Sequence, residues 1–185
     1  MIHSNFYNQF KIVVTGGPSS GKTTIINKLE NKGYACFNEK ARLLSKSKAV
    51  KIEFINNPSE FSNKIFNLRV KDYKSSNNIK TSKQLIFFDR GIHDTIAYLN
   101  HINKPFDFIG SLKKFSYSLI FILELNQKYY VNDSQRLETY SDALKIEKQI
   151  KETYTNFNQR VISVPWMKID KRVDFIIKKC TEELL

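Results

Sequence analysis

The sequence has 185 residues, of which 41% are hydrophobic and 26% are charged, and its formal net charge at pH 7 is +12. This length suits one compact domain over residues 1–185 with a hydrophobic core of its own. We find no run of the roughly 18 apolar residues that a membrane span needs, and the first ten residues lack the apolar centre of a signal peptide. We therefore expect a cytoplasmic protein with no membrane partner.

The positive charge raises the question of a nucleic-acid partner. Thirty Lys and Arg residues exceed eighteen Asp and Glu residues, but the lysines are spread along the chain and no block of five like charges marks a binding arm. Cys36, Cys180, His3, His93 and His101 lack the spacing of metal ligands, which predicts two reduced structural thiols and structural or solvated histidines. Composition thus permits nucleic-acid binding without favouring it, and leaves the oligomeric state open.

In chain order, the first predicted elements are a strand, a glycine-rich loop and a helix. Residues 10–15 form an apolar run that is typical of a buried parallel strand. The next nine residues, GGPSSGKTT, match the phosphate-loop pattern G-x-x-x-x-G-K-[ST]. Apolar residues at helical spacing then predict a helix that starts at Lys22 and ends at Gly33, where we expect a left-handed cap.

The composition of this loop predicts a nucleoside triphosphate site. Gly16 and Gly21 allow positive φ angles, so that consecutive backbone N–H groups can cradle the α- and β-phosphates. A solvent-facing Lys22 could reach the β- and γ-phosphates, Thr23 could offer its hydroxyl to Mg²⁺, and the helix would direct its positive end at the anion. The predicted nucleotide-binding residues are Gly16, Gly17, Pro18, Ser19, Ser20, Gly21, Lys22, Thr23 and Thr24.

The middle of the chain predicts two more strands, each followed by an acidic residue. Residues 34–37 form a short strand that leads to Glu39, and residues 85–88 form a buried strand that leads to Asp89. Between them lie a weakly helical basic segment, 41–51, and a helix from about residue 58 to 74. Ligands bind at the carboxyl ends of the strands in open α/β sheets, so both carboxylates should share the edge of the phosphate loop. Asp89 is therefore the predicted Mg²⁺ residue.

The last third continues the alternation of helices and strands. We expect a helix over 92–101, a strand over 118–125, a long amphipathic helix over 138–157, a strand over 160–164 and a final helix from about 169. The polar and aromatic segment around 126–139 has no clear periodicity and is interpreted as a mobile lid. The alternation predicts an α/β fold with a parallel sheet covered by helices on both faces.

Four motifs occur in one order: GGPSSGKTT, Glu39-x-x-Arg42, Asp89-Arg90-Gly91-x-x-Asp94 and Asp133-x-x-Arg136. With them the sequence resembles the AAA-type P-loop ATPase family related to bacterial ribosylnicotinamide kinase domains and, more distantly, thymidylate and deoxynucleoside kinases. The resemblance implies a three-layer α/β/α P-loop NTPase fold whose five parallel strands have the order 2-3-1-4-5. It also implies ATP- and Mg²⁺-dependent phosphoryl transfer to a small nucleoside-like or nucleotide acceptor.

The resemblance further implies roles for single residues. Beside Lys22, the expected catalytic residues are Glu39 as base or orienting group for the acceptor hydroxyl, Asp89 with Thr23 as Mg²⁺ ligands, Arg90 to neutralise the transferring phosphoryl group, and Arg136 from the lid. Acceptor contacts would come from Glu39, Arg42, Arg69 and Asp94. The loop around Val164 and Pro165 would flank the donor base. The residues themselves also allow a solvated Arg42 and Arg69, and a structural pairing of Arg90 with Glu39 or Asp94.

Two other functions stay open at this point. A regulatory NTPase would bind and slowly hydrolyse ATP or GTP as a switch, and it would not need the second pocket that Glu39, Arg42 and Arg69 imply. A polynucleotide kinase would use the same catalytic parts and would account for the positive charge, although no stripe of aromatic and basic residues marks a strand-binding groove. The identity of the acceptor does not follow from the sequence.

Overall fold

The structure, a computed structural model, describes residues 9–39, 57–106, 109–130 and 138–185. The elements in chain order are β1 (Phe10–Thr15), α1 (Lys22–Asn31), β2 (Ala35–Phe37), α4 (Pro58–Ser75), η1 (Ser76–Asn78), β3 (Leu85–Asp89), α5 (Asp94–His101), α6 (Ile109–Leu112), β4 (Leu119–Leu123), η2 (Gln127–Tyr129), α7 (Tyr140–Asn156), β5 (Val161–Val164) and α8 (Ile169–Leu184).

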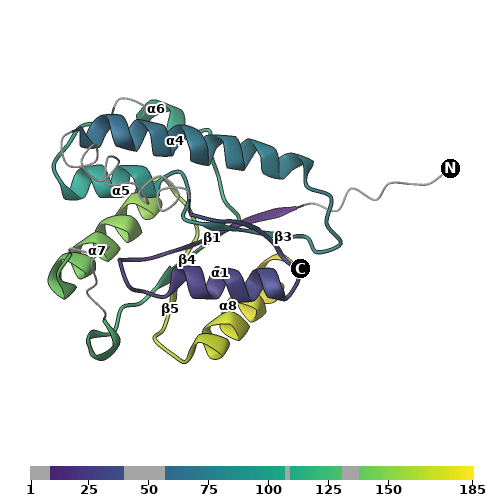
Figure 1. Ribbon diagram of the computed structural model, residues 1–185. Helices are drawn as coiled ribbons and strands as arrows, with labels where there is room; N and C mark the ends of the chain where they lie inside the picture. Colours follow the sequence, from purple (N-terminus) through teal and green to yellow (C-terminus); the bar gives the residue numbers. More distant parts are fainter. Residues whose placement is uncertain (1–8, 40–56, 107–108, 131–137) are drawn as a thin grey trace.

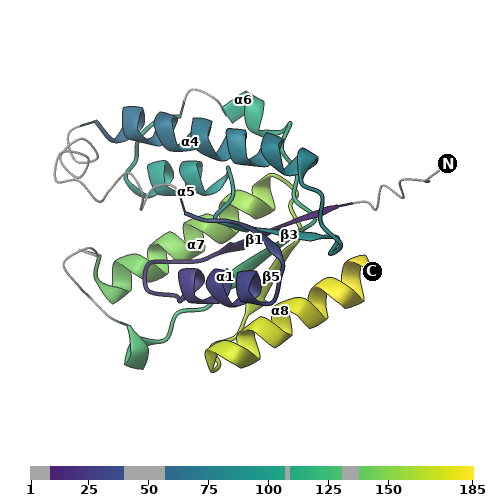
Figure 2. The ribbon, with the colours of Figure 1, turned by 45° about the vertical axis from the view of Figure 1, so that its right-hand side comes forward.

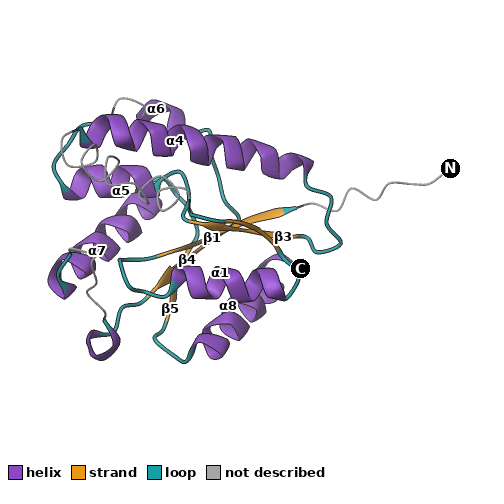
Figure 3. Cartoon of the chain, viewed as in Figure 1, coloured by secondary structure: helices purple, strands orange, loops and turns teal. Residues whose placement is uncertain are grey.

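The five strands form one parallel sheet in the order β2-β3-β1-β4-β5. Helices cover both faces of this sheet (Figures 1 and 3). Helices α1 and α8 lie side by side on one face (Figure 2), whereas α5 and α7 lie on the other, with α4 packed outside α5. The predicted three-layer fold and strand order are confirmed.

The core follows from the alternation of side chains along buried strands. In β1, Ile12 and Val14 face the cluster that α1 and α8 complete, while Val13 faces the cluster that α5 and α7 complete. All three are fully buried, which explains why the strand is a continuous apolar run instead of an alternating one. The central strands are therefore anchored from both sides, and the loops that follow them start from fixed points.

The strand register brings the carboxyl ends of the strands to one edge. Asp89, the last residue of β3, lies opposite Val14, and Thr15, the last residue of β1, lies opposite Ile122 of β4. At the far end of α1, Gly33 has φ +81°, so the predicted left-handed cap is confirmed.

Several predictions fall on residues that the structure does not describe: the helical segment 41–51 with Arg42, and most of the lid, 131–137, with Arg136. Of the lid's flanks, η2 is a single 3₁₀ turn. Among the described helices, none is long and apolar enough to cross a membrane. The cytoplasmic location and the single domain with a lid stay predictions.

Candidate functional site

The loop between β1 and α1 has the backbone conformation that its sequence predicts. The φ angles of Gly16, Ser19 and Gly21 are +144°, +60° and +90°. A Cβ on Gly16 would lie 2.8 Å from the carbonyl oxygen of Leu123, so the loop packs against the end of β4 as closely as a glycine allows. The loop is thus bent into a fixed turn at the start of α1, directly at the carboxyl edge of the sheet.

Lys22 lies inside this loop. Its ammonium donates hydrogen bonds to the carbonyl oxygens of Gly16 (3.1 Å) and Gly17 (2.7 Å) and to the hydroxyl of Ser20 (3.1 Å). Only 8% of the residue is exposed, so the expectation of a solvent-facing lysine is wrong. Burial, with the nearby positive charge of Arg90, lowers the pKa of Lys22 to about 7, although three surrounding carboxylates oppose this shift.

Asp89 provides a buried carboxylate beside the loop. The residue is 4% exposed, and its Oδ1 atom has no hydrogen-bond partner within the described part of the chain. Burial and the negative charge of Glu39 raise the pKa of Asp89 to about 6, against the pull of three neighbouring cations. An oxygen ligand without a proton donor fits a divalent cation.

A Mg²⁺ ion here would have few protein ligands. The described residues contain no group of three His, Cys, Asp or Glu side chains that could hold a metal by themselves. Asp89 and the half-buried Thr23, in the first turn of α1, are oxygen donors of the type that Mg²⁺ takes when phosphate and water oxygens complete its shell. The residues present therefore fit the predicted ion in a phosphate-dependent site.

Arg90 connects the end of β3 to the rest of the site. It adopts φ +73°, a left-handed conformation that costs a non-glycine residue about 1–3 kcal/mol. In this conformation its backbone N–H donates to the carbonyl of Val14 (3.1 Å), and its guanidinium contacts Glu39 (Nε to Oε2, 2.6 Å), Asp94 (Nη1 to Oδ1, 3.1 Å) and the hydroxyl of Tyr98 (2.8 Å). These side-chain contacts use three of the five guanidinium N–H groups.

Glu39 lies between two arginines. Its Oε1 atom accepts from Arg69 (Nη2, 3.1 Å) and its Oε2 atom from Arg90, while 14% of its side chain is exposed. Arg69 also donates to the hydroxyl of Thr95 (3.1 Å), and its Nε is buried without a partner among the described residues. Of the alternatives that the sequence left open, Arg69 is therefore buried instead of solvated, and Arg90 pairs with both Glu39 and Asp94.

Asp94 has a different position from the predicted one. It is fully buried, and its two carboxylate oxygens accept from Thr15, Arg90, Tyr154 and the backbone of Gly91. Burial alone would raise the pKa of Asp94, but the two arginines and the hydrogen bonds outweigh it and keep the pKa below its usual value. Asp94 is thus inaccessible to an acceptor, and we correct its role from substrate contact to support of Arg90.

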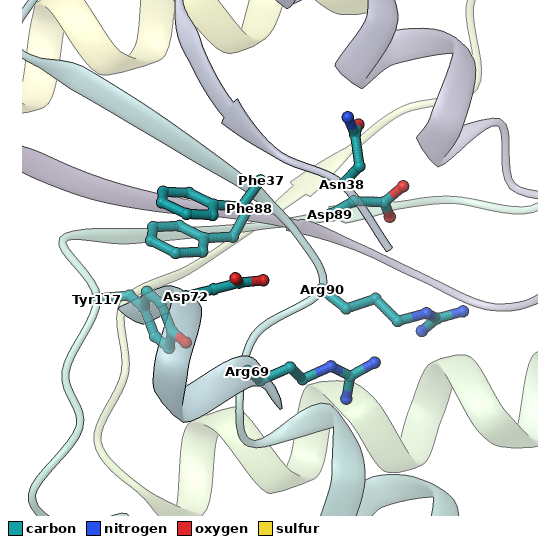
Figure 4. Close-up of a pocket in the computed structure, with 8 residues that line it drawn as sticks. All are labelled: Phe37, Asn38, Arg69, Asp72, Phe88, Asp89, Arg90 and Tyr117. Atoms are coloured by element: carbon teal, nitrogen blue, oxygen red, sulfur yellow. The ribbon is translucent and has the colours of Figure 1, made fainter. Parts of the chain in front are cut away.

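A pocket opens beside this cluster at the ends of β2 and β3. The rings of Phe37 and Phe88 stack in its wall, with centroids 4.9 Å apart and an interplanar angle of 7°. Figure 4 shows Arg69 and Arg90 extending in the same direction beside this wall. The residues that line the pocket are Phe37, Asn38, Arg69, Asp72, Phe88, Asp89, Arg90 and Tyr117 (Figure 4).

Tyr98 and Tyr154 are among the contributors that were not predicted as site residues. Tyr154 lies in α7, within the amphipathic helix predicted over 138–157, and its hydroxyl donates to Asp94 (2.7 Å) from 60 residues away. Tyr98 lies one turn beyond Asp94 on α5, a spacing that would place a side chain on the same face as Asp94. This spacing is a signal by which the sequence could have indicated Tyr98.

Comparisons with known proteins agree with this geometry. The family described as AAA domain matches residues 11–172. Deoxyadenosine kinase from M. mycoides with products dCMP and dCDP has a TM-score of 0.72 at 16% identity, covering 93% of this chain and 99% of that one. Thymidylate kinase from Candida albicans has a TM-score of 0.63 at 16% identity, covering 95% and 92%.

The NadR protein in complex with NR has a TM-score of 0.74 at 14% identity, and the match covers 95% of this chain but only 51% of NadR. None of the curated proteins matches the sequence. The predicted resemblance is confirmed in family and fold: the chain belongs to the AAA domain family and has the P-loop fold of these two kinases and of NadR.

Proposed function

We propose that the chain is a P-loop kinase that transfers the γ-phosphoryl group of ATP to a hydroxyl of a small nucleoside-like acceptor in a Mg²⁺-dependent reaction. The observation that carries this proposal is the partly exposed Glu39 carboxylate, held by Arg69 and Arg90 at the edge of the sheet that also bears the phosphate loop. A regulatory NTPase has no need of such a carboxylate or of the pocket beside it.

The chemistry requires positioning and positive charge more than covalent catalysis. The transition state of phosphoryl transfer is loose, with charge spread over the transferring oxygens, so cations held in fixed positions lower its energy. Lys22 would contact the β- and γ-phosphates, and Arg90 has two guanidinium N–H groups beyond the three that bond to described residues. Arg136 would add a third cation from the lid.

Glu39 would act on the acceptor. It would accept a hydrogen bond from the acceptor hydroxyl and take its proton as the oxygen bonds to the γ-phosphorus and the bond to ADP breaks. Its two ion pairs would fix the direction of the carboxylate, which favours a productive approach of the hydroxyl. Bound Mg²⁺, held by Asp89 and Thr23, would supply charge neutralisation at the phosphates.

The residues that line the pocket suit a flat acceptor with polar edges, but the cavity itself measures about 10 Å³, room for no more than one water molecule, so binding of an acceptor requires it to widen. The stacked Phe37 and Phe88 provide an aromatic wall, and Asn38, Asp72 and Arg69 place polar groups around it. Pockets with an apolar body and a few convergent polar groups suit a ring that carries hydrogen-bonding substituents. Arg69 lines the pocket, and Arg42 would contribute from the segment next to Glu39.

The test is Glu39→Gln, assayed with labelled ATP against nucleosides, nicotinamide riboside, mononucleotides and 5′-hydroxyl oligonucleotides. Transfer to the acceptor should fall roughly 100-fold or more, the usual range for a general base, while ATP affinity changes little. Glu60→Gln, on the exposed start of α4, is the matched control and should behave as the wild type.

Undiminished transfer by Glu39→Gln would contradict the role of Glu39. If no compound in the panel is phosphorylated and basal ATP hydrolysis is unchanged in the variant, the regulatory NTPase becomes the better description. Phosphorylation of the oligonucleotides alone would instead identify a polynucleotide kinase.

A further inference from the structure

Arg172 is a buried cation in an unfavourable place. It lies in the first turn of α8, where the helix macrodipole disfavours positive charge, and it is 2% exposed. Burial lowers the pKa of its guanidinium, and the charges of Glu124 and Glu147 only partly oppose this effect. A charge in such a position needs strong partners inside the protein.

Those partners are three backbone carbonyls from three different loops. Arg172 donates from Nη1 to Ser20 (2.8 Å), from Nη2 to Glu124 (2.5 Å) and from Nε to Pro165 (3.2 Å). The three acceptors follow β1, β4 and β5, so one guanidinium joins the phosphate loop to the two neighbouring loops on the same edge of the sheet. None of these bonds goes to a carboxylate.

The bond to Ser20 determines the direction of a neighbouring N–H group. The peptide between Ser20 and Gly21 is planar and trans, because the described chain has no cis peptide bond. In such a peptide the C=O and N–H groups point in opposite directions. Because Arg172 holds the Ser20 carbonyl, the N–H of Gly21 points away from α8, as a donor of the phosphate loop.

The other two bonds fix the loops that carry an exposed aromatic pair. Tyr129 follows β4 and Trp166 directly follows Pro165, and their rings stack with centroids 4.3 Å apart and an interplanar angle of 14°. Both rings are well exposed for aromatic side chains. Arg172 therefore also holds this pair at a set distance from the phosphate loop.

We propose that Arg172 is a positioning residue that orients the Gly21 N–H toward the phosphates of the donor and ties the phosphate loop to the loops after β4 and β5. The inference rests on the proposed function only in taking a nucleoside triphosphate as donor. Arg172 does not itself touch the donor. Its contribution is to the geometry of the groups that do.

The experiment is calorimetric titration of Arg172→Lys with ATP and with inorganic tripolyphosphate. A lysine keeps the charge but cannot reach three carbonyls in one plane. We expect both ligands to bind about tenfold more weakly, the loss of roughly one good hydrogen bond. Arg160→Lys, on an exposed arginine that pairs with Glu183, is the matched control and should bind both ligands as the wild type does.

A purely structural role predicts another result. In that case Arg172→Lys would lower the melting temperature but bind both ligands with wild-type affinity below it, and the proposal would be overturned. Should Arg172→Lys fail to fold, Arg172→Gln replaces it, because a neutral amide avoids a buried charge. In the wild type, tripolyphosphate must shift the ¹H–¹⁵N resonance of Gly21, and an unshifted resonance overturns the proposal without any variant.

These readouts separate the two proposals. Binding of ATP and tripolyphosphate requires no acceptor. If the wild type binds both ligands, Arg172→Lys binds them more weakly and no acceptor is phosphorylated, the kinase function is refuted and the role of Arg172 stands. Conversely, an active kinase whose affinity for tripolyphosphate is unaffected in Arg172→Lys would keep its function and lose this positioning residue.

Discussion

Replacing Asp94 by asparagine should destabilise the protein strongly, although the two side chains have nearly the same shape. In the wild type, Oδ1 accepts from Thr15 and Arg90, and Oδ2 accepts from the Gly91 N–H (2.9 Å) and the Tyr154 hydroxyl (2.7 Å). An amide has only one acceptor oxygen, so the asparagine side chain cannot serve both pairs of donors.

The orientation of the new amide follows from the strengths of these bonds. Turning its oxygen toward Arg90 keeps the charged donor satisfied and places the NH₂ group against Gly91 and Tyr154. The Tyr154 hydroxyl can rotate and accept, but the buried Gly91 N–H loses its partner, and Arg90 loses one of its two carboxylates. Breaking a buried ion pair by removing one charge costs on the order of 3–5 kcal/mol.

The assay is urea and thermal unfolding of Asp94→Asn beside the wild type. For a chain of this size that loss should lower the melting temperature by roughly 10 °C. The control is Asp170→Asn, which removes an exposed carboxylate paired with Lys28 in the first turn of α8 and should lower the melting temperature far less than Asp94→Asn does. An Asp94→Asn protein as stable as the wild type would refute the reasoning, because it would mean that the network tolerates an unpaired donor.

The pH dependence gives a second check on Asp94. Its pKa is lowered in the folded state, so its contribution to stability is complete above the unfolded pKa of about 3.9 and is lost as the pH falls through the folded value. The acid limb of the stability curve should therefore be flatter in Asp94→Asn. Wild-type and variant curves that stay parallel below pH 4 would contradict the assignment.

Two further substitutions test the donor side. Lys22→Met should weaken ATP binding by roughly 1.5–3 kcal/mol. The pKa of Lys22 is lowered to about 7 in the free chain, so the wild type should take up a proton when it binds ATP, and its affinity should fall between pH 7 and 9. Calorimetry of Lys22→Met should show neither the proton uptake nor this pH dependence. Asp89→Asn should reduce Mg²⁺-dependent transfer far more than Mg²⁺-free ATP binding. Because the pKa of Asp89 is raised to about 6 in the folded protein, its buried negative charge destabilises the wild type at pH 7. Asp89→Asn should therefore raise the free energy of unfolding of the metal-free protein at pH 7 by a value on the order of 2 kcal/mol, and this gain should disappear below about pH 4, where Asp89 is protonated in both the folded and the unfolded state.

Local pattern was enough to locate most elements of the fold. Apolar runs predicted each strand within about two residues of its observed ends, because strands buried on both faces need uninterrupted apolar side chains. Helical periodicity and turn residues did the same for helices such as α7 and α8. The strand order came from the resemblance, since no local pattern states which strands pair.

The site was predictable only in part, because its contacts join distant segments. Because ligands bind at the carboxyl ends of parallel strands, the sequence predicted that Glu39 and Asp89 lie at the same edge of the sheet as the phosphate loop. It did not predict that Glu39 lies between two arginines. The left-handed conformation of Arg90 was not predicted, because arginine has no preference for that conformation and no local sequence pattern indicates it. Arg172 did leave a signal, namely a cation in the first turn of a helix, where charge of that sign is disfavoured.

The donor and acceptor sides of the site share one chain of contacts. Thr15 immediately precedes the phosphate loop and donates to Asp94, Asp94 accepts from Arg90, and Arg90 donates to Glu39 at the acceptor pocket. Each link is buried or nearly so, where electrostatic interactions are stronger than in water and unpaired groups are costly. A shift of Arg90 therefore moves the carboxylate that would meet the acceptor. For this reason the effects of Asp94→Asn and Glu39→Gln cannot be treated as independent. Loss of the ion pair between Arg90 and Asp94 would also change the geometry of the ion pair between Arg90 and Glu39.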